Sequence, residues 1–343
     1  MLKKIFAAML SVFLIFSLCS CDVAQEENDP PEQEDISVSE EILEEPRFTV
    51  TFDKNEAFPD EISKRAAKII DPSIEVAVKM LNTIPEYGYN VIECDYSERR
   101  TEKDDLTDET AVYWYGFIYE KMSNLEDFRL YPEENGGEEF YLSFYTAESA
   151  LMTDHREIFL CGATWMDEED GSICPIYFMP GEWLDNPCSD KEAIKSEAAV
   201  YDRIVERIFE KMPAGLDNYQ KVCYFAFVTV AAAEYDHSYE DHASVYTPYD
   251  TLVLGKTVCR GYAMTFYELC RRAGISCRYC EGMVPSGFHA WNKIDTAEGS
   301  FWIDLTGYDN ENIAGNYNEG DTEYLFMTEE EIDEREYREG IFE

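Results

Sequence analysis

The sequence predicts an α+β fold in which a helix that begins at a cysteine packs on an antiparallel sheet. Apolar residues recur at helical spacing from Ala263 to Ala273, and Gly274 follows as a residue suited to end a helix. Three segments come next that are predicted to be strands, at Ser276–Val284, His289–Asp295 and Ser300–Thr306. The turn sequence Thr296-Ala297-Glu298-Gly299 joins the last two. A smaller and less regular α+β region precedes this block, at residues 48–200.

The elements of that earlier region are predicted from shorter patterns. Alternating or extended apolar patterns predict strand-like segments at Phe48–Phe52, Phe140–Phe144, Glu157–Thr164 and Ile176–Met179. Helical patterns predict helices at Pro59–Lys68, Pro72–Leu81, Val112–Met122, Ala147–His155 and Asp190–Met212. A further helix, Tyr219–Tyr235, is apolar on nearly all sides and is expected to be buried, with Asp217 or Asn218 as its N-cap. The cysteine-bearing domain is therefore expected at 201–328, with an acidic tail at 329–343.

Cys259 is the candidate nucleophile because of where the helix pattern places it. Thr257 is the expected N-cap, so Cys259 lies in the first turn. The helix dipole and the free backbone N–H groups of a first turn favour an anion and so activate a thiol. A lone cysteine is more often a small buried apolar residue than a nucleophile, so the assignment depends on its partners.

Those partners are an imidazole and a carboxylate downstream of the thiol. His289 begins the word His-Ala-Trp-Asn, and Asp304 lies in the word Trp-Ile-Asp-Leu-Thr. If the last two strands form a hairpin around their even-length turn, the two side chains share one face and lie close together. A thiolate that attacks, an imidazole that moves the proton and a carboxylate that orients the imidazole make an activated cysteine nucleophile.

The words Val-Cys-Arg-Gly-Tyr-Ala, His-Ala-Trp-Asn and Trp-Ile-Asp-Leu-Thr, in this order, resemble the transglutaminase-like superfamily, a branch of the papain-like cysteine enzymes. The resemblance covers roughly residues 213–328. It implies a papain-like core and a thioester mechanism on protein or peptide amides, with Cys259, His289 and Asp304 as the triad. Members of the superfamily hydrolyse or crosslink, and some have lost activity, so a crosslinking transferase and a non-catalytic module that binds peptide or glycan stay as alternatives.

Two further features bear on the chemistry. A tyrosine in or beside the loop before the nucleophile helix is expected to donate a hydrogen bond to an oxyanion, alongside the Cys259 amide; the candidates are Tyr235, Tyr239 and Tyr246. Arg260 and Gly261 follow Cys259 directly, where animal transglutaminases carry a bulky aromatic residue. This more polar neighbourhood favours water as the acceptor, so hydrolysis is expected to be the main outcome.

The N-terminus has the pattern of an exported lipoprotein. Lys3 and Lys4 precede an apolar run that ends in Leu18-Cys19-Ser20-Cys21, which resembles a lipobox and implies a signal peptide at 1–20 with lipid on Cys21. Residues 21–47 are acidic, with very few large apolar residues, and are expected to be a disordered tether. The expected location is extracytoplasmic, with the protein held at the cell membrane by its lipid.

Composition narrows the partners. The formal net charge of −44 excludes nucleic acid as an expected partner and leaves a protein or peptide substrate. No cofactor and no metal site are expected, since Cys277-Arg278-Tyr279-Cys280 is a single pair of cysteines in a strand. Alternation in that strand points the two thiols to opposite faces and argues against a disulfide between them. The nine cysteines left after export fit one free nucleophile with up to four bridges, or no bridges at all.

Overall fold

The computed structural model describes residues 46–53, 55–85, 88–96, 102–155, 158, 160–167, 169–182, 187–237, 246–311 and 323–340. Its helices are α2 (Glu61–Leu81), α3 (Glu102–Asp105), α4 (Glu109–Ser123), α5 (Glu138–Asp154), α6 (Lys191–Glu210), α7 (Asn218–Ala232), α8 (Cys259–Arg272), α9 (Leu305–Glu311) and α10 (Glu329–Glu334), with a 3-10 turn at Pro132–Glu134 and a π-helical turn at Asp250–Leu254. Its strands are β1 (Gly162–Met166), β2 (Ile173–Tyr177), β3 (Glu234–Tyr235), β4 (Lys256–Thr257), β5 (Cys277–Val284), β6 (Gly287–Thr296), β7 (Gly299–Ile303) and β8 (Arg338–Glu339).

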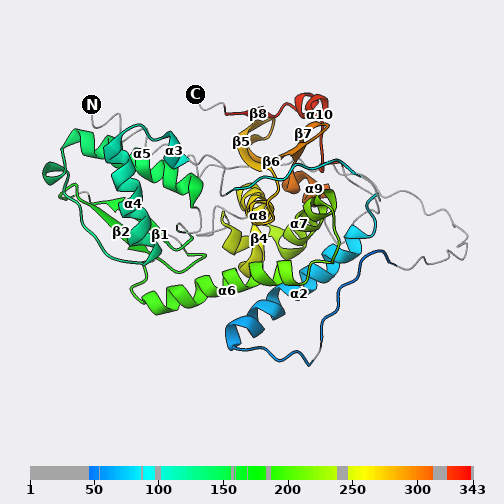
Figure 1. The fold of residues 1–343 in the computed structure, drawn as a ribbon. Coiled ribbons are helices and arrows are strands. Elements are labelled where there is room, and N and C mark those ends of the chain that lie inside the picture. Colours follow the sequence, from blue (N-terminus) through cyan, green and yellow to red (C-terminus); the bar gives the residue numbers. More distant parts are fainter. Residues whose placement is uncertain are drawn as a thin grey trace, which may run out of the picture.

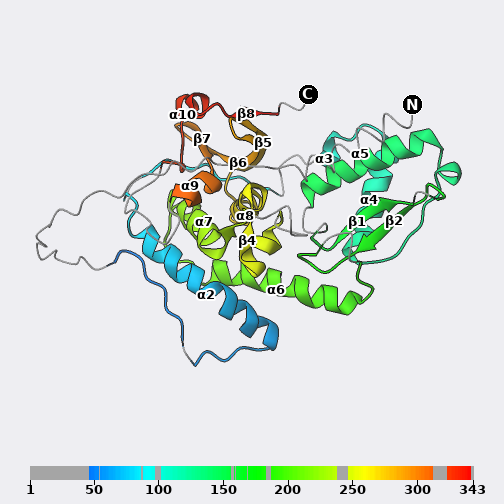
Figure 2. The ribbon, with the colours of Figure 1, turned by 180° about the vertical axis from the view of Figure 1, so that it is seen from behind.

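These elements form an α+β protein, as the sequence predicts (Figure 1). One part holds α7, α8 and the main sheet, and the region of α3, α4, α5, β1 and β2 lies beside it. The view from behind in Figure 2 shows the same arrangement, with α6 running along the bottom of both parts. Helices α2 and α6 pack on each other, and α2 also packs on α7, so both α2 and α6 belong to the sheet-containing part.

The main sheet has the strand order β7-β6-β5-β8 and is antiparallel throughout. In the β6–β7 hairpin, Thr296 pairs with Gly299 and Asn292 with Ile303, which confirms the predicted hairpin and its turn. The last strand ends at Ile303, three residues earlier than predicted, because Leu305 and Thr306 begin α9. That early end places Asp304 at the junction between the sheet and a helix.

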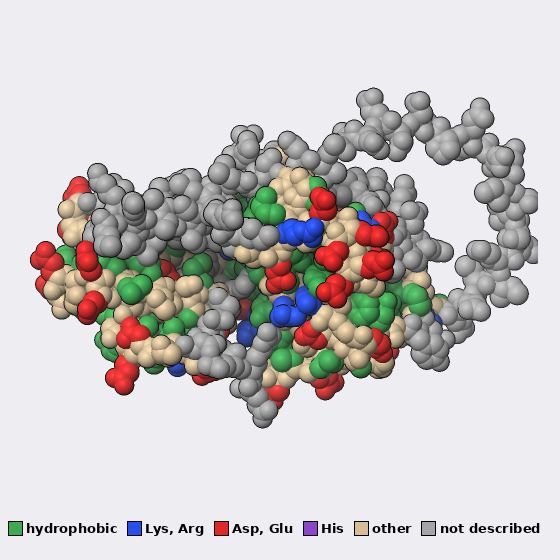
Figure 3. Space-filling view, turned by 90° about the horizontal axis from the view of Figure 1, so that it is seen from above, with side chains coloured by type: hydrophobic (Ala, Val, Ile, Leu, Met, Phe, Trp, Pro, Cys, Tyr) green, Lys and Arg blue, Asp and Glu red, His purple; other side chains and the backbone are tan. Residues whose placement is uncertain are grey.

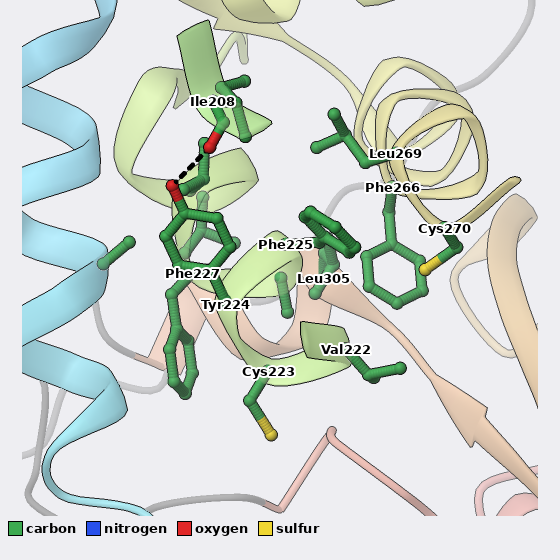
Figure 4. Close-up of a cluster of buried hydrophobic side chains, with 14 of the residues drawn as sticks. Ile208, Val222, Cys223, Tyr224, Phe225, Phe227, Phe266, Leu269, Cys270 and Leu305 are labelled. Carbon is green, nitrogen blue, oxygen red and sulfur yellow. Dashed lines mark hydrogen bonds between the residues drawn. The ribbon is translucent and has the colours of Figure 1, made fainter. Parts of the chain in front are cut away.

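Helix α8 packs on β5 and β6 with its apolar face, and α7 covers α8 from the other side. Figure 4 shows a cluster of buried side chains in the resulting core, in which α7 contributes more of the labelled residues than any other element. They include Val222, Cys223, Tyr224, Phe225 and Phe227 of α7, Phe266, Leu269 and Cys270 of α8, and Leu305. Full burial of each large apolar side chain is worth about 1.5–3 kcal/mol, so this core fixes where α8 begins relative to the sheet.

A buried guanidinium holds α6 to α2. Arg207 is 1% exposed and donates paired hydrogen bonds to the carboxylates of Asp71 in α2 and Glu56 just before it. Two bidentate pairs satisfy the guanidinium in its low-dielectric surroundings. The ion pairs to Arg207 hold the pKa of Glu56 at about 2, despite the opposing effect of burial.

The region beside the core has a small aromatic core of its own, made by α4 and α5. Its members include Trp114, Ile118, Phe140, Phe144 and Leu151. The prediction of a strand at Phe140–Phe144 is therefore wrong, because these rings belong to a helical face that continues to Ala147 and Leu151. The helix at Val112–Met122 is confirmed within α4.

Two other predictions, both near the start of the chain, need correction. Pro72 does not separate two helices; it lies inside the single helix α2, where Ile70 and Ile74 on either side are fully buried in the main core. Burial outweighs the hydrogen bond that a proline cannot make. The segment Phe48–Phe52 forms no strand, although Phe48, Val50 and Phe52 pack against the core. The long helix predicted at Asp190–Met212 is confirmed as α6, with Asp190 as its N-cap.

The sequence placed the ends of the cysteine-bearing domain at 200/201 and 328/329, but neither position separates two independently packed parts. The first lies in the middle of α6, and the second precedes α10 and β8, which pack on the main sheet. Among the described residues, none of the helices combines the length and apolar character needed to span a membrane. Acidic side chains are spread over the face seen in Figure 3, while lysine and arginine form small groups.

Candidate active site

Helix α8, which carries the candidate nucleophile, begins at Cys259 itself. Its N-cap is Val258, in extended conformation and without a side-chain cap, so the prediction of Thr257 as N-cap is wrong. Thr257 is held instead in a short parallel ladder, in which β3 and β4 pair Tyr235 with Thr257. The ladder continues through Asp236, whose N–H donates to the Thr257 carbonyl at 2.8 Å. Cys259 therefore lies in the first turn, as predicted, where the helix dipole favours a thiolate.

His289 and Asp304 are brought together by the hairpin. The Nε2–H of His289 donates to Asp304 Oδ2 at 2.8 Å, and the two residues are 5% and 2% exposed. The hydrogen bond confirms the prediction that these side chains share one face of the β6–β7 hairpin. Because Nε2 faces the carboxylate, Nδ1 is the ring nitrogen that can exchange a proton with a thiol.

Asp304 is anchored on both of its oxygens. Its Oδ1 accepts the backbone N–H groups of Thr306 at 3.0 Å and Gly307 at 3.2 Å, in the first turn of α9. Its Oδ2 accepts the hydroxyl of Tyr337 at 2.5 Å in addition to His289. Burial acts to raise the pKa of Asp304, but the charge and N–H of His289, with the Tyr337 hydroxyl and the Gly307 amide, hold it below the usual value. A carboxylate bound in this way stays ionised and fixes the imidazole orientation.

Cys259 lies against the residues that flank His289. It is 1% exposed and forms a small buried cluster with Ala263 and Ala290, against which Phe288 and Tyr279 pack. Phe288 and Ala290 are the chain neighbours of His289, so the thiol and the imidazole belong to adjacent parts of α8 and β6.

Asn292 joins the nucleophile helix to the histidine strand. Its side-chain amide is fully buried and donates to the carbonyl of Ala263 in α8 at 3.0 Å. Asn292 belongs to β6, three residues after His289, so this hydrogen bond fixes α8 along the strand. Asn292 is the last residue of the His-Ala-Trp-Asn word, but the sequence did not predict that it links β6 to α8, because its partner is evident only from the packing.

Trp291 and Tyr337 form an aromatic wall around the imidazole. The Trp291 ring stacks on His289 at 6.1 Å, and Tyr337 meets Trp291 edge to face at 5.0 Å. Trp291 and Trp302 both lie in the cluster with Cys280 and Met327, whereas Cys259 belongs to a separate cluster. Tyr337 was missed, since it follows the expected end of the domain.

Two of the three oxyanion candidates lie beside the start of α8. Tyr235 and Tyr246 both pack against Val258, the residue before Cys259. Tyr239 lies outside the described residues. Tyr235 in β3 and Tyr246 at the end of the preceding loop therefore lie side by side with Val258, at the N-terminus of α8.

The other cysteines are structurally distinct from Cys259. None of the nine cysteines in the described part takes part in a disulfide, which favours the alternative without bridges. Cys277 faces the main core while Cys280 faces the cluster of Trp291, so the predicted divergence of the two thiols is confirmed. Burial raises the pKa of the thiols of Cys161 to about 11 and of Cys223 to about 12, and raises that of Cys270 well above its usual value. These thiols are poor nucleophiles near neutral pH.

Within the described ranges, no three His, Cys, Asp or Glu side chains gather in a way that could hold a metal ion. The lipidation candidate Cys21 lies outside the described residues, as do the signal peptide and almost all of the expected tether.

A helix that begins at a cysteine and packs on a sheet bearing a His–Asp pair is the core arrangement of the papain-like cysteine enzymes. Residues 203–306 match the family model described as "Transglutaminase-like superfamily", so the chain carries a transglutaminase-like core domain and the resemblance seen in the sequence is confirmed. The match includes Cys259, His289 and Asp304.

A solved structure described as "Crystal structure of a TGase" matches with 17% sequence identity and a TM-score of 0.29, over 41% of this chain and 38% of that chain. The chain therefore aligns with well under half of that protein's length. No curated protein matches the sequence.

Proposed function

We propose that the protein is a cysteine-dependent acyl-transfer enzyme acting on protein or peptide amides, with Cys259 as nucleophile, His289 as general base and acid, and Asp304 as the residue that orients His289. One observation carries the proposal. His289, which forms a buried pair with Asp304 at 2.8 Å, lies on β6, and the first turn of the Cys259 helix packs on that strand at Ala290.

The geometry supports a two-step reaction. In the first step, Cys259 Sγ gives its proton to His289 Nδ1 and bonds to the acyl carbon. The C–N bond then breaks, and the imidazolium returns the proton to the departing amine. In the second step, water or an amine attacks the thioester and loses its proton through His289, which releases the acyl product and restores the thiol.

We favour hydrolysis as the main outcome, because Arg260 and Gly261 follow the nucleophile where animal transglutaminases carry an aromatic residue. The crosslinking alternative has one observation in its favour, namely the aromatic pair Tyr279 and Phe288 that packs against the cluster of Cys259. Aromatic walls beside a thioester exclude water and favour an amine acceptor.

A competition assay tests both the activity and the outcome. The protein is incubated with a glutamine-containing peptide and a labelled primary amine at millimolar concentration, and both products are followed by mass. Acid formation above amine incorporation is the expected result, and a Cys259→Ala variant is the matched control. More amine product than acid would establish the transferase, while no turnover of any peptide would favour a module that only binds peptide or glycan.

The oxyanion donors are proposed to be the Cys259 amide and one of the two tyrosines beside Val258. Phenylalanine at the donating position removes one hydrogen bond to the developing charge and is expected to lower kcat about 100-fold with little change in KM. Tyr235→Phe and Tyr246→Phe, measured side by side, serve as controls for each other. Equal wild-type kcat in both variants would contradict this part of the proposal.

The location is proposed from the N-terminal pattern, with lipid on Cys21 and an extracytoplasmic catalytic domain. Fractionation and intact mass test it. Membrane association and a mass that includes lipid on Cys21 are expected, and Cys21→Ala should release or misprocess the chain. An unmodified chain that retains Met1 would contradict the anchor and leave the catalytic proposal untouched.

A further inference from the structure

The segment 323–340 lies beyond the match to the transglutaminase-like core, yet it is built onto the catalytic sheet. Met327 and Trp302 exchange both backbone hydrogen bonds, at 2.8 and 2.9 Å. Helix α10 begins at a capping box of Thr328 and Glu331, and β8 then pairs with β5. The segment is thus fixed at three places along its length.

The anchored segment places the side chain of Tyr337 against the carboxylate of Asp304. Tyr337 lies between α10 and β8, and its hydroxyl donates to Asp304 Oδ2 at 2.5 Å. The same oxygen accepts His289. The phenol ring also meets the imidazole edge to face at 6.1 Å and Trp291 at 5.0 Å. Tyr337 therefore contacts the rings of both His289 and Trp291 as well as the carboxylate of Asp304.

We propose that the segment 323–340 completes the catalytic site, with Tyr337 as a positioning residue that keeps Asp304 ionised and aimed at His289. The inference rests on the proposed function, since it assigns Tyr337 a role in the same triad. It adds a fourth side chain, from outside the family core, on which the triad depends.

The physical reason is the cost of a buried charge. Asp304 is 2% exposed, so each donor to its carboxylate stabilises the ionised form. The groups that face it are His289 from β6, two backbone amides from α9, and Tyr337; behind Tyr337 lie Tyr324 and Arg335. Removing the Tyr337 hydroxyl takes away the only side-chain donor besides His289 among the described residues, so Asp304 is expected to protonate at a higher pH.

The test measures the alkylation rate of Cys259 by iodoacetamide between pH 4 and 8, with peptide mapping. Tyr337→Phe removes one oxygen and keeps the ring. The acid midpoint of Cys259 alkylation is expected to move up by about one pH unit, and the rate at the wild-type midpoint to fall about fivefold. The matched control is Tyr224→Phe. It also removes a buried tyrosine hydroxyl that donates one hydrogen bond, here to the Ile208 carbonyl in the main core (Figure 4).

A second variant detaches the segment without changing Tyr337. Gly282 of β5 pairs with Glu339 of β8. A Cβ at Gly282 would overlap the Arg338 carbonyl oxygen and lie 2.9 Å from the Trp291 ring. Gly282→Ala is therefore expected to reproduce the upward shift. A wild-type midpoint in both Gly282→Ala and Tyr337→Phe would overturn the proposal.

A double variant separates a positioning role from a general loss of stability. If Tyr337 acts through Asp304, Asp304→Asn with Tyr337→Phe alkylates as slowly as Asp304→Asn alone. If the double variant is slower than Asp304→Asn by the factor that Tyr337→Phe alone causes, the two residues act independently and the inference is contradicted. If wild-type Cys259 reacts no faster than Cys270, the proposed function itself fails; if it reacts fast and Tyr337→Phe matches wild type, only the role of Tyr337 fails.

Discussion

Two buried carboxylates, one in each part of the molecule, respond to burial in opposite directions. Asp304, beside the main sheet, is bound by His289, Tyr337 and two amides, and its pKa lies below the usual value. Glu148, in α5 of the region beside it, has the Thr164 hydroxyl as its hydrogen-bond partner, and burial raises its pKa to about 7. Burial alone favours the neutral acid, and only a full set of donors keeps a buried carboxylate charged.

The difference indicates where chemistry can occur. A charged carboxylate can hold an imidazole in one tautomer and stabilise it when protonated, as catalysis requires. Glu148, whose carboxyl is neutral below its raised pKa, cannot stabilise a cation in this way and accepts the Thr164 hydroxyl within a packed region. The comparison is therefore consistent with the catalytic role that we propose for Asp304, and it gives Glu148 a structural role in its own region.

The largest effect is expected from Asp304→Asn. The amide can keep its oxygen on the α9 backbone only by presenting an NH2 group to His289, which selects the wrong imidazole tautomer. Turnover of the peptide substrate is expected to fall about 10³- to 10⁴-fold while the fold survives. Asp295→Asn in the same hairpin is the control, since that carboxylate bonds only to Ser276 and Ser300 among the hydrogen bonds described here. Wild-type turnover in Asp304→Asn would show that the pair does no catalytic work.

Arg207 is the cationic counterpart of Asp304, because it is a buried charge whose hydrogen-bonding groups are paired, here with the carboxylates of Asp71 and Glu56. Arg207→Met leaves the carboxylates of Asp71 and Glu56 without their guanidinium, and the free energy of unfolding is expected to fall by about 3–5 kcal/mol. Arg203→Met, one turn earlier on α6, removes a more exposed pair with Glu210 and is expected to cost less than about 1 kcal/mol. Urea unfolding of the two variants measures the difference, and equal losses would contradict the account.

Glu148 gives a smaller effect that depends on pH. The unfolded chain ionises this carboxyl near 4.5 and the folded protein only near 7, so the unfolded state gains between these values. The contribution of Glu148 to stability is therefore highest below pH 4.5 and falls by about 3 kcal/mol as pH rises through 7. Glu148→Gln is expected to remove this dependence, whereas Glu139→Gln, exposed at the start of α5, should retain it. Urea unfolding at pH 5 and 7.5 provides the check; an unchanged slope in Glu148→Gln would refute it.

Local sequence predicted the site better than it predicted the region beside it. The hairpin register follows from an even-length turn, so the meeting of His289 and Asp304 could be predicted from spacing alone. The five residues Phe140–Phe144 alternate like a strand, and their helical face emerges only over the longer run to Leu151. In α2, tertiary burial of Ile70 and Ile74 overrode the break that Pro72 predicts.

Tyr337 marks the limit of that approach. It meets Asp304 from 33 residues further along the chain, after α10 and at the approach to β8. No local pattern around Tyr337 indicates a catalytic partner, since its position depends on the Met327–Trp302 and β5–β8 pairings. The acidic composition of residues 329–343 predicted a tail because charge dominates the pattern, whereas Ile332 and Tyr337 supply the packing.

The most direct test of the central claim compares Cys259 with equally buried thiols. Cys259 and Cys223 are each 1% exposed and Cys270 is fully buried, so access alone does not favour Cys259. Brief exposure to iodoacetamide at pH 6.5, followed by peptide mapping, is expected to label Cys259 at least about tenfold faster than either, and His289→Ala should abolish the advantage. If Cys259 is labelled no faster than Cys223 and Cys270, it is not an activated nucleophile and the catalytic account is wrong.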